Sequence, residues 1–205
     1  MSDSFQVVVV DDEDAVRRLI CQILERAGHT VRGFADADSF FAEFDADKTA
    51  CIVADLRMPK VDGLQLLRQI RSLDGVIAVV ILTGHADVRT AVQLMEDGAL
   101  TLLEKPFEPA ELQAVVERAV EQTKSRRAER DTLSSARRAY DELSEEERRV
   151  LEQMLTGLPN KAIVNRLGLS PRTVDRRRSA VLTKMNVGSV SELATLVTKL
   201  KLSNS

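Results

Sequence analysis

Five side chains that lie far apart in the sequence have the chemistry needed for phosphoryl transfer. They are two adjacent acids, a single acid, a hydroxyl and an amine: Asp11, Asp12, Asp55, Thr83 and Lys105. A carboxylate can attack a phosphoryl group to form an acyl phosphate. Clustered carboxylates repel one another, and a site made of oxygen ligands open to water favours Mg²⁺. An ammonium group and a hydroxyl can hold the transferred oxygens.

Each of these residues follows a short apolar segment. Residues 50–54, which precede Asp55, carry no charge and are too few for a helix, so they are predicted to form a strand buried on both faces. Taken singly, Asp55 could simply cap the next turn. Thr83 and Asp11 could be helix caps, and Lys105 a solvated surface charge. The other segments predicted to be strands are residues 5–10, 29–34, 76–82 and 100–103.

Amphipathic helical patterns separate the predicted strands. Residues 16–27 carry apolar side chains at spacings of three and four, and Gly28 ends the pattern. Alternating strands and helices with short links imply right-handed crossovers and a doubly wound α/β fold with a five-stranded parallel sheet. In that fold all strands end at one edge, so the five residues are expected to meet there. Further helices are predicted from residue 37 or 38, over 62–71 and 86–97, and after Pro109.

The composition is typical of a globular protein. The 205 residues are 44% hydrophobic and 30% charged, and no run of 18 apolar residues suggests a membrane span. The amino-terminal residues lack the pattern of a secretory leader, so we expect a cytoplasmic protein. Cys21 and Cys51 are far apart and lie in apolar surroundings, which favours buried, reduced thiols over a metal or redox site.

Charge is distributed unevenly along the chain. Residues 1–122 carry 12 basic and 22 acidic side chains, residues 123–142 carry 6 and 4, and residues 143–205 carry 11 and 6. The three net charges are −10, +2 and +5. An acidic first part and a basic last part indicate two domains with different partners, of which the basic one faces a polyanion.

The middle segment, residues 123–142, is predicted to be a helical linker. It contains neither Gly nor Pro, which a flexible tether would be rich in. We expect the last helix of the first domain to run on into it, with a break around residues 132–135. Leu133, Ala136 and Tyr140 form a narrow apolar stripe, which would either pair with a second copy or belong to a solvated linker.

The basic segment has the pattern of short helices joined by a tight turn. Ser144 with Glu147 three positions later is a capping box, and a buried apolar stripe follows it. Residues 160–167 are predicted to form a short helix, Gly168 the turn, and Ser170 the cap of a longer helix. This is a helix-turn-helix arrangement in an all-α domain.

One face of the longer helix is basic and is predicted to contact DNA. Four arginines fall within seven positions, although a single arginine would more simply belong to a solvated face. Projection at 100° per residue puts Val174 and Val181 on the opposite face. Arg172 and Arg176 are candidates for bidentate contacts to guanine, and Lys161, Arg177, Arg178 and Lys184 for contacts to phosphate. The complete predicted set is Lys161, Arg172, Thr173, Asp175, Arg176, Arg177, Arg178, Ser179 and Lys184.

Residues 5 to about 122 resemble the receiver domain of two-component response regulators, and we assign residues 1–122 to this domain. The matching segments, in the family's order and spacing, are VVVVDDEDAVRRL, VADLRMPKVDGLQLL, VVILTGHAD and LLEKPFEP. The resemblance implies a flavodoxin-like fold in which Asp55 is the phospho-acceptor. It also implies that Thr83 and Lys105 hold the phosphoryl group. The peptide bond before Pro106 is commonly cis in this family.

The same resemblance implies Mg²⁺ as the cofactor. Its ligands would be Asp12 and Asp55 directly, Asp11 through water, and the backbone carbonyl of Arg57.

The sequence departs from the receiver family at Leu102, where Tyr or Phe is usual. In the family's switch, the hydroxyl that corresponds to Thr83 moves toward the phosphate and the aromatic ring follows it. A leucine side chain has less surface than an aromatic ring to move into the space that the hydroxyl leaves, and it has no polar group at its end. We therefore expect a smaller population shift on phosphorylation, or one that uses other residues.

Residues 140–203 resemble the LuxR-type helix-turn-helix of the NarL/FixJ subfamily of response regulators. The matching segment is LSEEERRVLEQMLTGLPNKAIVNRLGLSPRTVDRRRSAVLTKMNV. Glu146 stands where Arg is usual and Arg149 where Glu is usual, which we interpret as a reversed charge pair. Arg177 stands where His is frequent. Base specificity is therefore not transferable from the family.

The sequence predicts a phosphorylation-dependent DNA-binding transcription regulator. A sensor histidine kinase would phosphorylate the receiver, which would form a homodimer that aligns the domain of residues 143–205 on a two-fold operator in double-stranded DNA. Apart from self-phosphorylation and self-dephosphorylation, no enzyme activity is expected. One alternative is a regulator whose DNA binding is independent of phosphorylation. Another is an aspartyl-phosphate hydrolase, which is disfavoured because such enzymes place a second acid where Arg57 stands.

Overall fold

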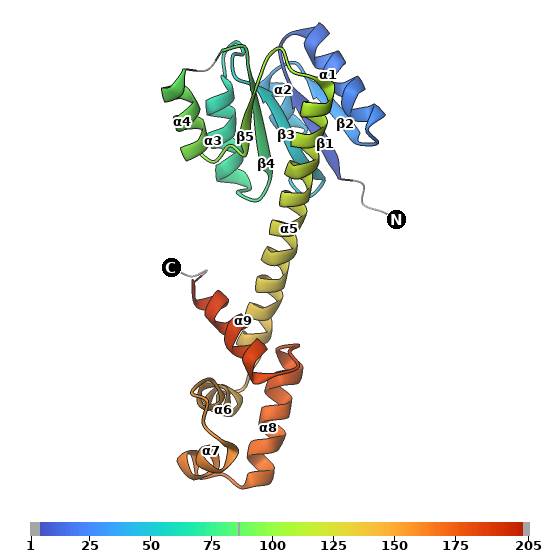
Figure 1. Cartoon of the computed structure of the whole chain (residues 1–205). Helices are drawn as coiled ribbons and strands as arrows, with labels where there is room; N and C mark the ends of the chain where they lie inside the picture. Colours follow the sequence, from blue (N-terminus) through green and yellow to red (C-terminus); the bar gives the residue numbers. More distant parts are fainter. Residues whose placement is uncertain (1–4, 86, 203–205) are drawn as a thin grey trace. The chain divides into compact units, whose positions relative to one another are not determined.

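The computed structural model describes residues 5–85 and 87–202 (Figure 1). The chain divides into two compact units, the first extending to Arg127 and the second beginning at Ala128. This division falls inside helix α5 (Pro109–Asp141). The two halves of this helix therefore contribute side chains to two separate cores.

A parallel β-sheet forms the centre of the first unit (Figure 1). The strands are β1 (Gln6–Val10), β2 (Thr30–Phe34), β3 (Thr49–Asp55), β4 (Ala78–Thr83) and β5 (Thr101–Glu104). They lie in the order β2-β1-β3-β4-β5, and every neighbouring pair is parallel. The predicted doubly wound, five-stranded α/β fold is thereby confirmed. The chain changes direction across the sheet after β2, so the crevice above β1 and β3 is where this fold class binds ligands.

Helices cover both faces of the sheet (Figure 1). Besides α5 they are α1 (Asp14–Arg26), α2 (Ala37–Ala42), α3 (Gly63–Leu73) and α4 (Val88–Glu96). Val8 and Ile52 belong to the core shared with α2, α3 and α4, whereas Val9 and Val53 belong to the core shared with α1 and α5. Both faces are buried, which explains why these strands are apolar throughout. The predicted start of α4 at Ala86 lies outside the described residues.

Helix α5 is continuous over 33 residues, so the break predicted around residues 132–135 is wrong. The Thr132 hydroxyl donates to the backbone carbonyl four positions earlier, at 2.7 Å, which satisfies this polar group without ending the helix. The stripe of Leu133, Ala136 and Tyr140 packs into the core of the second unit. It is therefore covered by the chain itself, and neither a second copy nor solvent is needed to explain it.

Two polar side chains fasten the first part of α5 to the sheet. The fully buried Thr123 hydroxyl accepts a hydrogen bond from the Ala78 N–H at the start of β4, at 2.9 Å. Arg127, only 7% exposed, donates to three backbone carbonyls within residues 46–49 and stacks on the Phe5 ring at 5.0 Å. Three acceptors offset much of the cost of burying a guanidinium group.

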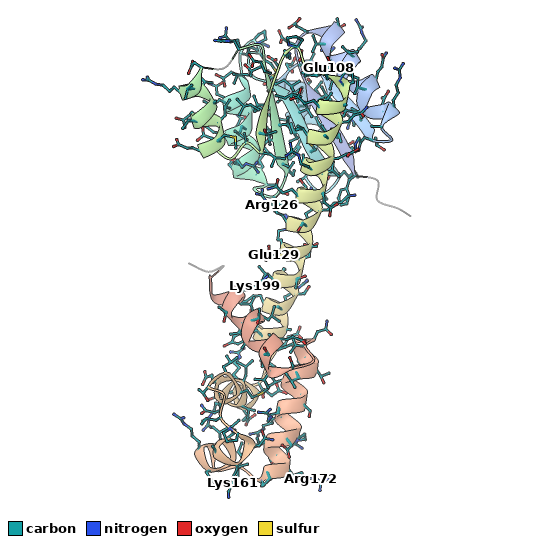
Figure 2. The ribbon with its side chains drawn as sticks, viewed as in Figure 1. Glu108, Arg126, Glu129, Lys161, Arg172 and Lys199 are labelled. Atoms are coloured by element: carbon teal, nitrogen blue, oxygen red, sulfur yellow. The ribbon has the colours of Figure 1, made fainter. Side chains whose placement is uncertain are left out.

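The second unit consists of helices, without strands, in the residues that the structure describes (Figure 1). After α5 come α6 (Glu145–Leu155), α7 (Asn160–Leu167), α8 (Pro171–Lys184) and α9 (Val190–Leu202). Val150, Ile163, Val174 and Leu193, one from each of these helices, are fully buried in one core. The sequence interpretation missed α9. An ion pair of 3.0 Å between Lys199 of α9 and Glu129 of α5 adds a surface contact (Figure 2).

The predicted helix-turn-helix and its caps are confirmed. In the capping box, the Glu147 N–H donates to Ser144 Oγ at 3.2 Å, and the Ser144 N–H donates to Glu147 Oε2 at 2.8 Å. Gly168 ends α7 with a φ of 65°, a conformation that favours glycine. Ser170 caps α8 by accepting from the Thr173 N–H at 3.2 Å. The turn between α7 and α8 is thus defined by side chains that the sequence identifies.

Of the two cysteines predicted to be buried, reduced thiols, Cys51 is buried and Cys21 is only partly buried. Cys51 is fully buried in β3, and this burial strongly raises the pKa of its thiol. Cys21 is partly buried, and burial raises its pKa as well. A thiol with a raised pKa forms little of the reactive thiolate.

Among the described residues, no helix combines the length and the apolar character that crossing a membrane requires.

Candidate phosphoryl-transfer site and DNA-binding surface

Lys105 joins two buried carboxylates at the carboxyl edge of the sheet. Its ammonium nitrogen lies 2.6 Å from Asp55 Oδ1 and 2.9 Å from Asp11 Oδ2. Asp11 is fully buried and Asp55 is 7% exposed. The three residues follow or end β1, β3 and β5, so the parallel sheet brings together side chains up to 94 positions apart.

Backbone hydrogen bonds fix the orientation of all three groups. The Lys105 N–H donates to the Thr83 carbonyl at 2.7 Å, which holds the residue after β5 against the end of β4. Asp55 Oδ2 and Asp11 Oδ1 each accept a hydrogen bond from the N–H two residues later, at 2.7 and 2.9 Å. Each carboxylate therefore uses one oxygen for the backbone and the other for the ammonium group.

The electrostatics of this cluster keep Lys105 charged. Burial by itself lowers the pKa of the Lys105 ammonium group, but the hydrogen bonds and charges of Asp55 and Asp11 outweigh burial. The pKa of Lys105 therefore lies above its ordinary value. At neutral pH the group is a permanent cation beside the Asp55 carboxylate.

A glycine allows α3 to start directly against the end of β3. The Gly63 N–H donates to the Leu56 carbonyl at 2.9 Å. A Cβ at Gly63 would lie 2.6 Å from the Asp55 carbonyl oxygen and 2.9 Å from the Leu56 Cα, closer than real Cβ atoms approach. The backbone that carries Asp55 is thus held in place by a contact that only glycine permits.

The two predicted switch residues lie on neighbouring strands. Thr83 ends β4 and is 3% exposed, and its Oγ1 accepts a hydrogen bond from the His85 N–H at 3.2 Å. Leu102 pairs with Ile81 in the β4–β5 register and packs, partly buried, against the core shared with α2, α3 and α4. The peptide bond between Lys105 and Pro106 is cis, as the resemblance implied.

Asp12 and Arg57, the remaining residues predicted for this site, lie at an open pocket of about 640 Å³. Both are exposed. The Asp12 side chain makes no hydrogen bond or ion pair with any described residue, whereas Asp11 and Asp55 are engaged by Lys105. Other residues at this pocket are Leu56, Met58, Pro59, Asp62, Leu64, His85, Asp87 and Thr90.

The donor chemistry of this edge fits a hard divalent cation. Asp11, Asp12 and Asp55 supply oxygen ligands only, and with Lys105 their charges sum to −2, which a divalent ion would neutralise. In the described part of the chain, no three acidic, histidine or cysteine side chains are arranged as a metal site. Two of the carboxylates instead point their oxygens at Lys105 and at backbone N–H groups.

In the second unit, α8 presents a basic face. Arg172 and Arg176 are exposed, while Arg177 and Arg178 are partly buried. None of these four guanidinium groups makes a hydrogen bond or ion pair with a described residue, so they are available to an external anion. Figure 2 shows that Lys161 of α7 and Arg172 of α8 project from the same end of this unit. Thr173 is partly buried in the first turn of α8, and Ser179 is exposed further along it.

Two charged residues predicted to contact DNA are engaged within the unit. Lys184 forms an ion pair with Glu147 Oε2 at 2.7 Å. The Glu147 carboxylate therefore partly neutralises the Lys184 ammonium group that was predicted to contact phosphate. Asp175 Oδ1 accepts a hydrogen bond of 2.7 Å from the Asn160 side-chain amide. The sequence interpretation missed both partners, Glu147 and Asn160, because they lie 37 and 15 positions away.

Two family models match the chain. Residues 7–117 match the model described as response regulator receiver domain, and residues 141–197 match the model described as bacterial regulatory proteins, luxR family. The chain belongs to the response regulators with a LuxR-type DNA-binding domain. As in the sequence resemblance, this response regulator falls in the NarL/FixJ group, because FixJ proteins are among its relatives.

Its relatives are similar over nearly their whole length. The response regulator is 39% identical to the transcriptional regulatory protein FixJ of Azorhizobium caulinodans, over 94% of this chain and 92% of that protein. It is 30% identical to the response regulator protein TodT of Pseudomonas putida, over 98% and 89%.

Two solved structures are also similar to this chain. The response regulator StyR matches with a TM-score of 0.82 and 33% identity, covering 96% of this chain and 99% of that one. Full-length FixJ from B. japonicum matches with a TM-score of 0.59 and 35% identity, covering 97% and 98%.

Family membership establishes the general function of this response regulator. It is a transcription regulator controlled by phosphorylation, as the sequence predicted. A receiver and a LuxR-type domain imply a histidine kinase and DNA as partners, and receiver domains generally use Mg²⁺ for phosphorylation. A hydrolase built around an aspartyl phosphate, the alternative from another class, is not what this family does.

Proposed function

We propose that Asp55 is the residue of this regulator that a sensor histidine kinase phosphorylates. The observation that carries the proposal is the position of the Lys105 ammonium group, 2.6 Å from Asp55 and 2.9 Å from Asp11. A carboxylate at a strand end, held beside a permanent cation, is suited to attack phosphorus and to keep the product's charge compensated. Asp11 is fully buried, which leaves Asp55 as the more accessible of the two.

The transfer follows from these positions. A carboxylate oxygen of Asp55 attacks the phosphorus of a phosphohistidine, and the N–P bond breaks as the O–P bond forms. The histidine nitrogen leaves with the electron pair of that bond and takes up a proton. Lys105 donates to the transferred oxygens, and the Thr83 hydroxyl donates a hydrogen bond that exists only after transfer. Water attack on the acyl phosphate reverses the modification, which makes the receiver its own phosphatase.

We assign the Mg²⁺ ligands as the sequence resemblance implies. Asp12 and Asp55 would bind the ion directly, Asp11 through water, and Arg57 through its backbone carbonyl. When bound, the ion offsets negative charge on the phosphoryl oxygens. The Asp12 side chain, which has no partner in the described part of the chain, and the all-oxygen donor set support this assignment.

For the second unit, we propose that α8 lies in the DNA major groove. Arg172 and Arg176 would contact guanine edges, with Thr173, Asp175 and Ser179 on the same surface. Phosphate contacts would come from Lys161, Arg177, Arg178 and Lys184. The four guanidinium groups of α8, which have no partner among the described residues, support this proposal. Each phosphate contact adds to the salt dependence of binding.

Phosphorylation would couple the receiver, residues 1–122, to the DNA-binding domain, residues 143–205. Residues 123–142 form the helical connection in this proposal. We expect the phosphorylated receiver to form a homodimer, which would place two DNA-binding domains on a two-fold operator. The proposal places the regulator in the cytoplasm, where both DNA and the kinase domain are accessible.

A gel shift with an operator fragment, with and without acetyl phosphate or beryllofluoride, tests the coupling. We expect the wild-type protein to bind DNA more tightly after treatment, and Asp55→Asn to be unaffected by acetyl phosphate. Equal affinity of the wild type under both conditions would support the alternative, a regulator whose DNA binding is independent of phosphorylation. Uptake of phosphate label by Asp55→Asn would overturn the assignment of the acceptor.

Leu102 is the proposed site at which this switch differs from the usual one. Leu102→Phe would introduce the aromatic ring that is usual in the family at this partly buried position. We therefore expect the variant to strengthen dimerisation after phosphorylation. Size-exclusion chromatography of both proteins with beryllofluoride measures this. An unchanged dimer fraction would remove Leu102 from the switch.

A further inference from the structure

A hydrogen bond ties the acidic residue of the DNA-facing helix to the start of the preceding helix. Asn160 Nδ2 donates to Asp175 Oδ1 at 2.7 Å. Asp175 is the one acid in the sequence of α8, which is otherwise neutral or basic over Pro171–Lys184. Both side chains are exposed, so this bond is made at the surface and not inside the core.

The helix turn that carries Asn160 is anchored to the core of the second unit. It is the first residue of α7, and the N–H groups of Ala162 and Ile163 donate to the Pro159 carbonyl at 2.9 and 3.2 Å. Ile163 is fully buried, which anchors this turn to the core. The side-chain amide of Asn160 engages one oxygen of Asp175, and the other oxygen has no partner among the described residues.

We propose that Asp175 reads the amino group of a cytosine in the major groove and that Asn160 is the positioning residue that orients it. This inference rests on the proposed function, because it requires α8 to lie in the groove. It adds a specific base to that proposal. It also assigns a role to Asn160, which the sequence interpretation did not include.

The chemistry of an ionised carboxylate selects cytosine. Asp175 has no hydrogen to donate, so it needs a donor on the base edge. Guanine presents two acceptors, N7 and O6, and thymine presents O4, all of which repel a carboxylate. The amino group of adenine lies between two acceptors, its own N7 and O4 of the paired thymine, whereas the N4 amino group of cytosine has an acceptor on one side only, O6 of the paired guanine. Cytosine is therefore the base that offers the free oxygen of Asp175 a donor with the fewest neighbouring acceptors.

The position of Asp175 on the helix agrees with base reading. It lies three residues after Arg172 and one before Arg176, and it is exposed on the flank of α8, about 100° around the helix axis from the buried Val174. Near phosphate, an acid would only weaken binding, because like charges repel. Holding the carboxylate in advance lowers the entropy that is lost when DNA binds.

Selection of binding sites from a random duplex pool tests the proposal. The full-length protein treated with beryllofluoride is compared with Asp175→Asn and Asn160→Ala. We expect the wild type to select cytosine at one position of each half-site, with roughly tenfold discrimination. Asp175→Asn should shift that position toward adenine, the base that asparagine pairs with, and leave the other positions unchanged. Asn160→Ala should weaken the cytosine preference at the same position only.

Matched variants separate base reading from a role in folding. Asn165→Ala removes another exposed asparagine of α7, and Glu152→Gln another exposed acid of the unit; neither side chain bonds to a described residue. Both should select the wild-type sequence. Asn160→Gln, which keeps the amide, should restore part of the preference that Asn160→Ala loses. Thermal unfolding of each variant checks that the helices remain folded.

Three outcomes are distinguishable. If the wild type selects a sequence and Asp175→Asn selects the same one, the base-reading role is overturned and the bond only joins α7 to α8. If Asn160→Ala keeps the full preference at the Asp175-dependent position, Asn160 is not the positioning residue. If the wild type enriches no sequence at all, the failure lies with the proposed DNA-binding function itself.

Discussion

The Lys105 ammonium nitrogen lies 2.6 Å from Asp55 Oδ1, although 50 positions separate the two residues in the sequence. The same nitrogen lies 2.9 Å from the fully buried Asp11. Lys105 is therefore the one counter-charge that these two carboxylates share within the described residues. Its removal would affect both the folding of this edge and the chemistry proposed for it.

Replacing Lys105 with glutamine should lower the stability of the receiver at neutral pH. The variant leaves two buried carboxylates beside each other without a cation, and we expect a loss of about 1–3 kcal/mol in the free energy of unfolding. Urea unfolding at pH 7 measures this loss. Lys124→Gln, which removes an exposed lysine of α5, should change the free energy by less than about 0.5 kcal/mol.

The effect of Lys105 should also depend on pH in a defined direction. Its folded-state pKa is raised above the ordinary value of a lysine, about 10.4. Its contribution to stability is therefore fully present below that pH and is lost as the pH rises through the folded-state pKa. The stability difference between the wild type and Lys105→Gln should stay constant from pH 7 to about 10 and then shrink. A difference that grows above pH 10.5 would contradict the raised pKa.

Replacing Gly63 with alanine should distort the end of β3. The new Cβ would lie 2.6 Å from the Asp55 carbonyl oxygen, so either the strand end or the start of α3 must shift. Such overpacking costs about 1–3 kcal/mol, and the displaced Asp55 should accept phosphate more slowly. Unfolding and the rate of phosphorylation by acetyl phosphate measure the two effects. Gly75→Ala is the matched control, because its nearest neighbour would be 4.0 Å away, and it should change neither quantity.

The sequence allowed the candidate site to be predicted because its signals are local. Apolar segments that end in an acid or a hydroxyl identify strand ends, and a parallel sheet places all strand ends at one edge. Asp11, Asp55 and Lys105 meet for this reason alone. The capping box of Ser144 and Glu147 was predictable in the same way, since both of its residues lie within four positions.

Other contacts have no local signal and were not predictable. Arg127 binds backbone carbonyls 78 to 81 positions away, and a carbonyl acceptor is the same whatever the residue type. The sequence therefore presented Arg127 as one more charge of an exposed linker. The break expected near Thr132 was wrong for a related reason, because its hydroxyl is satisfied inside the helix.

Replacing Arg127 with methionine should destabilise the receiver although no predicted site residue changes. Three backbone carbonyls would lose a charged donor, and Phe5 would lose the guanidinium group stacked on it. We expect a loss of about 2–3 kcal/mol, measured by urea unfolding of the full chain. Arg126→Met, which alters the exposed neighbouring arginine, should remain within about 0.5 kcal/mol of the wild type. Equal stability of the two variants would mean that Arg127 does not anchor α5.

Replacing Glu147 with glutamine should reveal how much the ion pair with Lys184 contributes to the second unit. Glutamine can still complete the capping box with Ser144, so the variant removes mainly the charge. The hydrogen bond from Lys184, followed by that from the Ser144 N–H, lowers the pKa of the Glu147 carboxyl below its ordinary value, about 4.3. A lowered pKa stabilises the fold above pH 4.3, and this stabilisation disappears as the pH falls through the folded-state pKa.

We expect Glu147→Gln to cost roughly 0.5–1 kcal/mol in the free energy of unfolding at pH 7, a small loss because the ion pair is partly solvated. Near pH 2 the variant should cost almost nothing. Thermal unfolding at both pH values measures the difference. Glu152→Gln should have no effect at either pH, and a deficit of Glu147→Gln that persists at pH 2 would show that packing, not charge, makes the contact important.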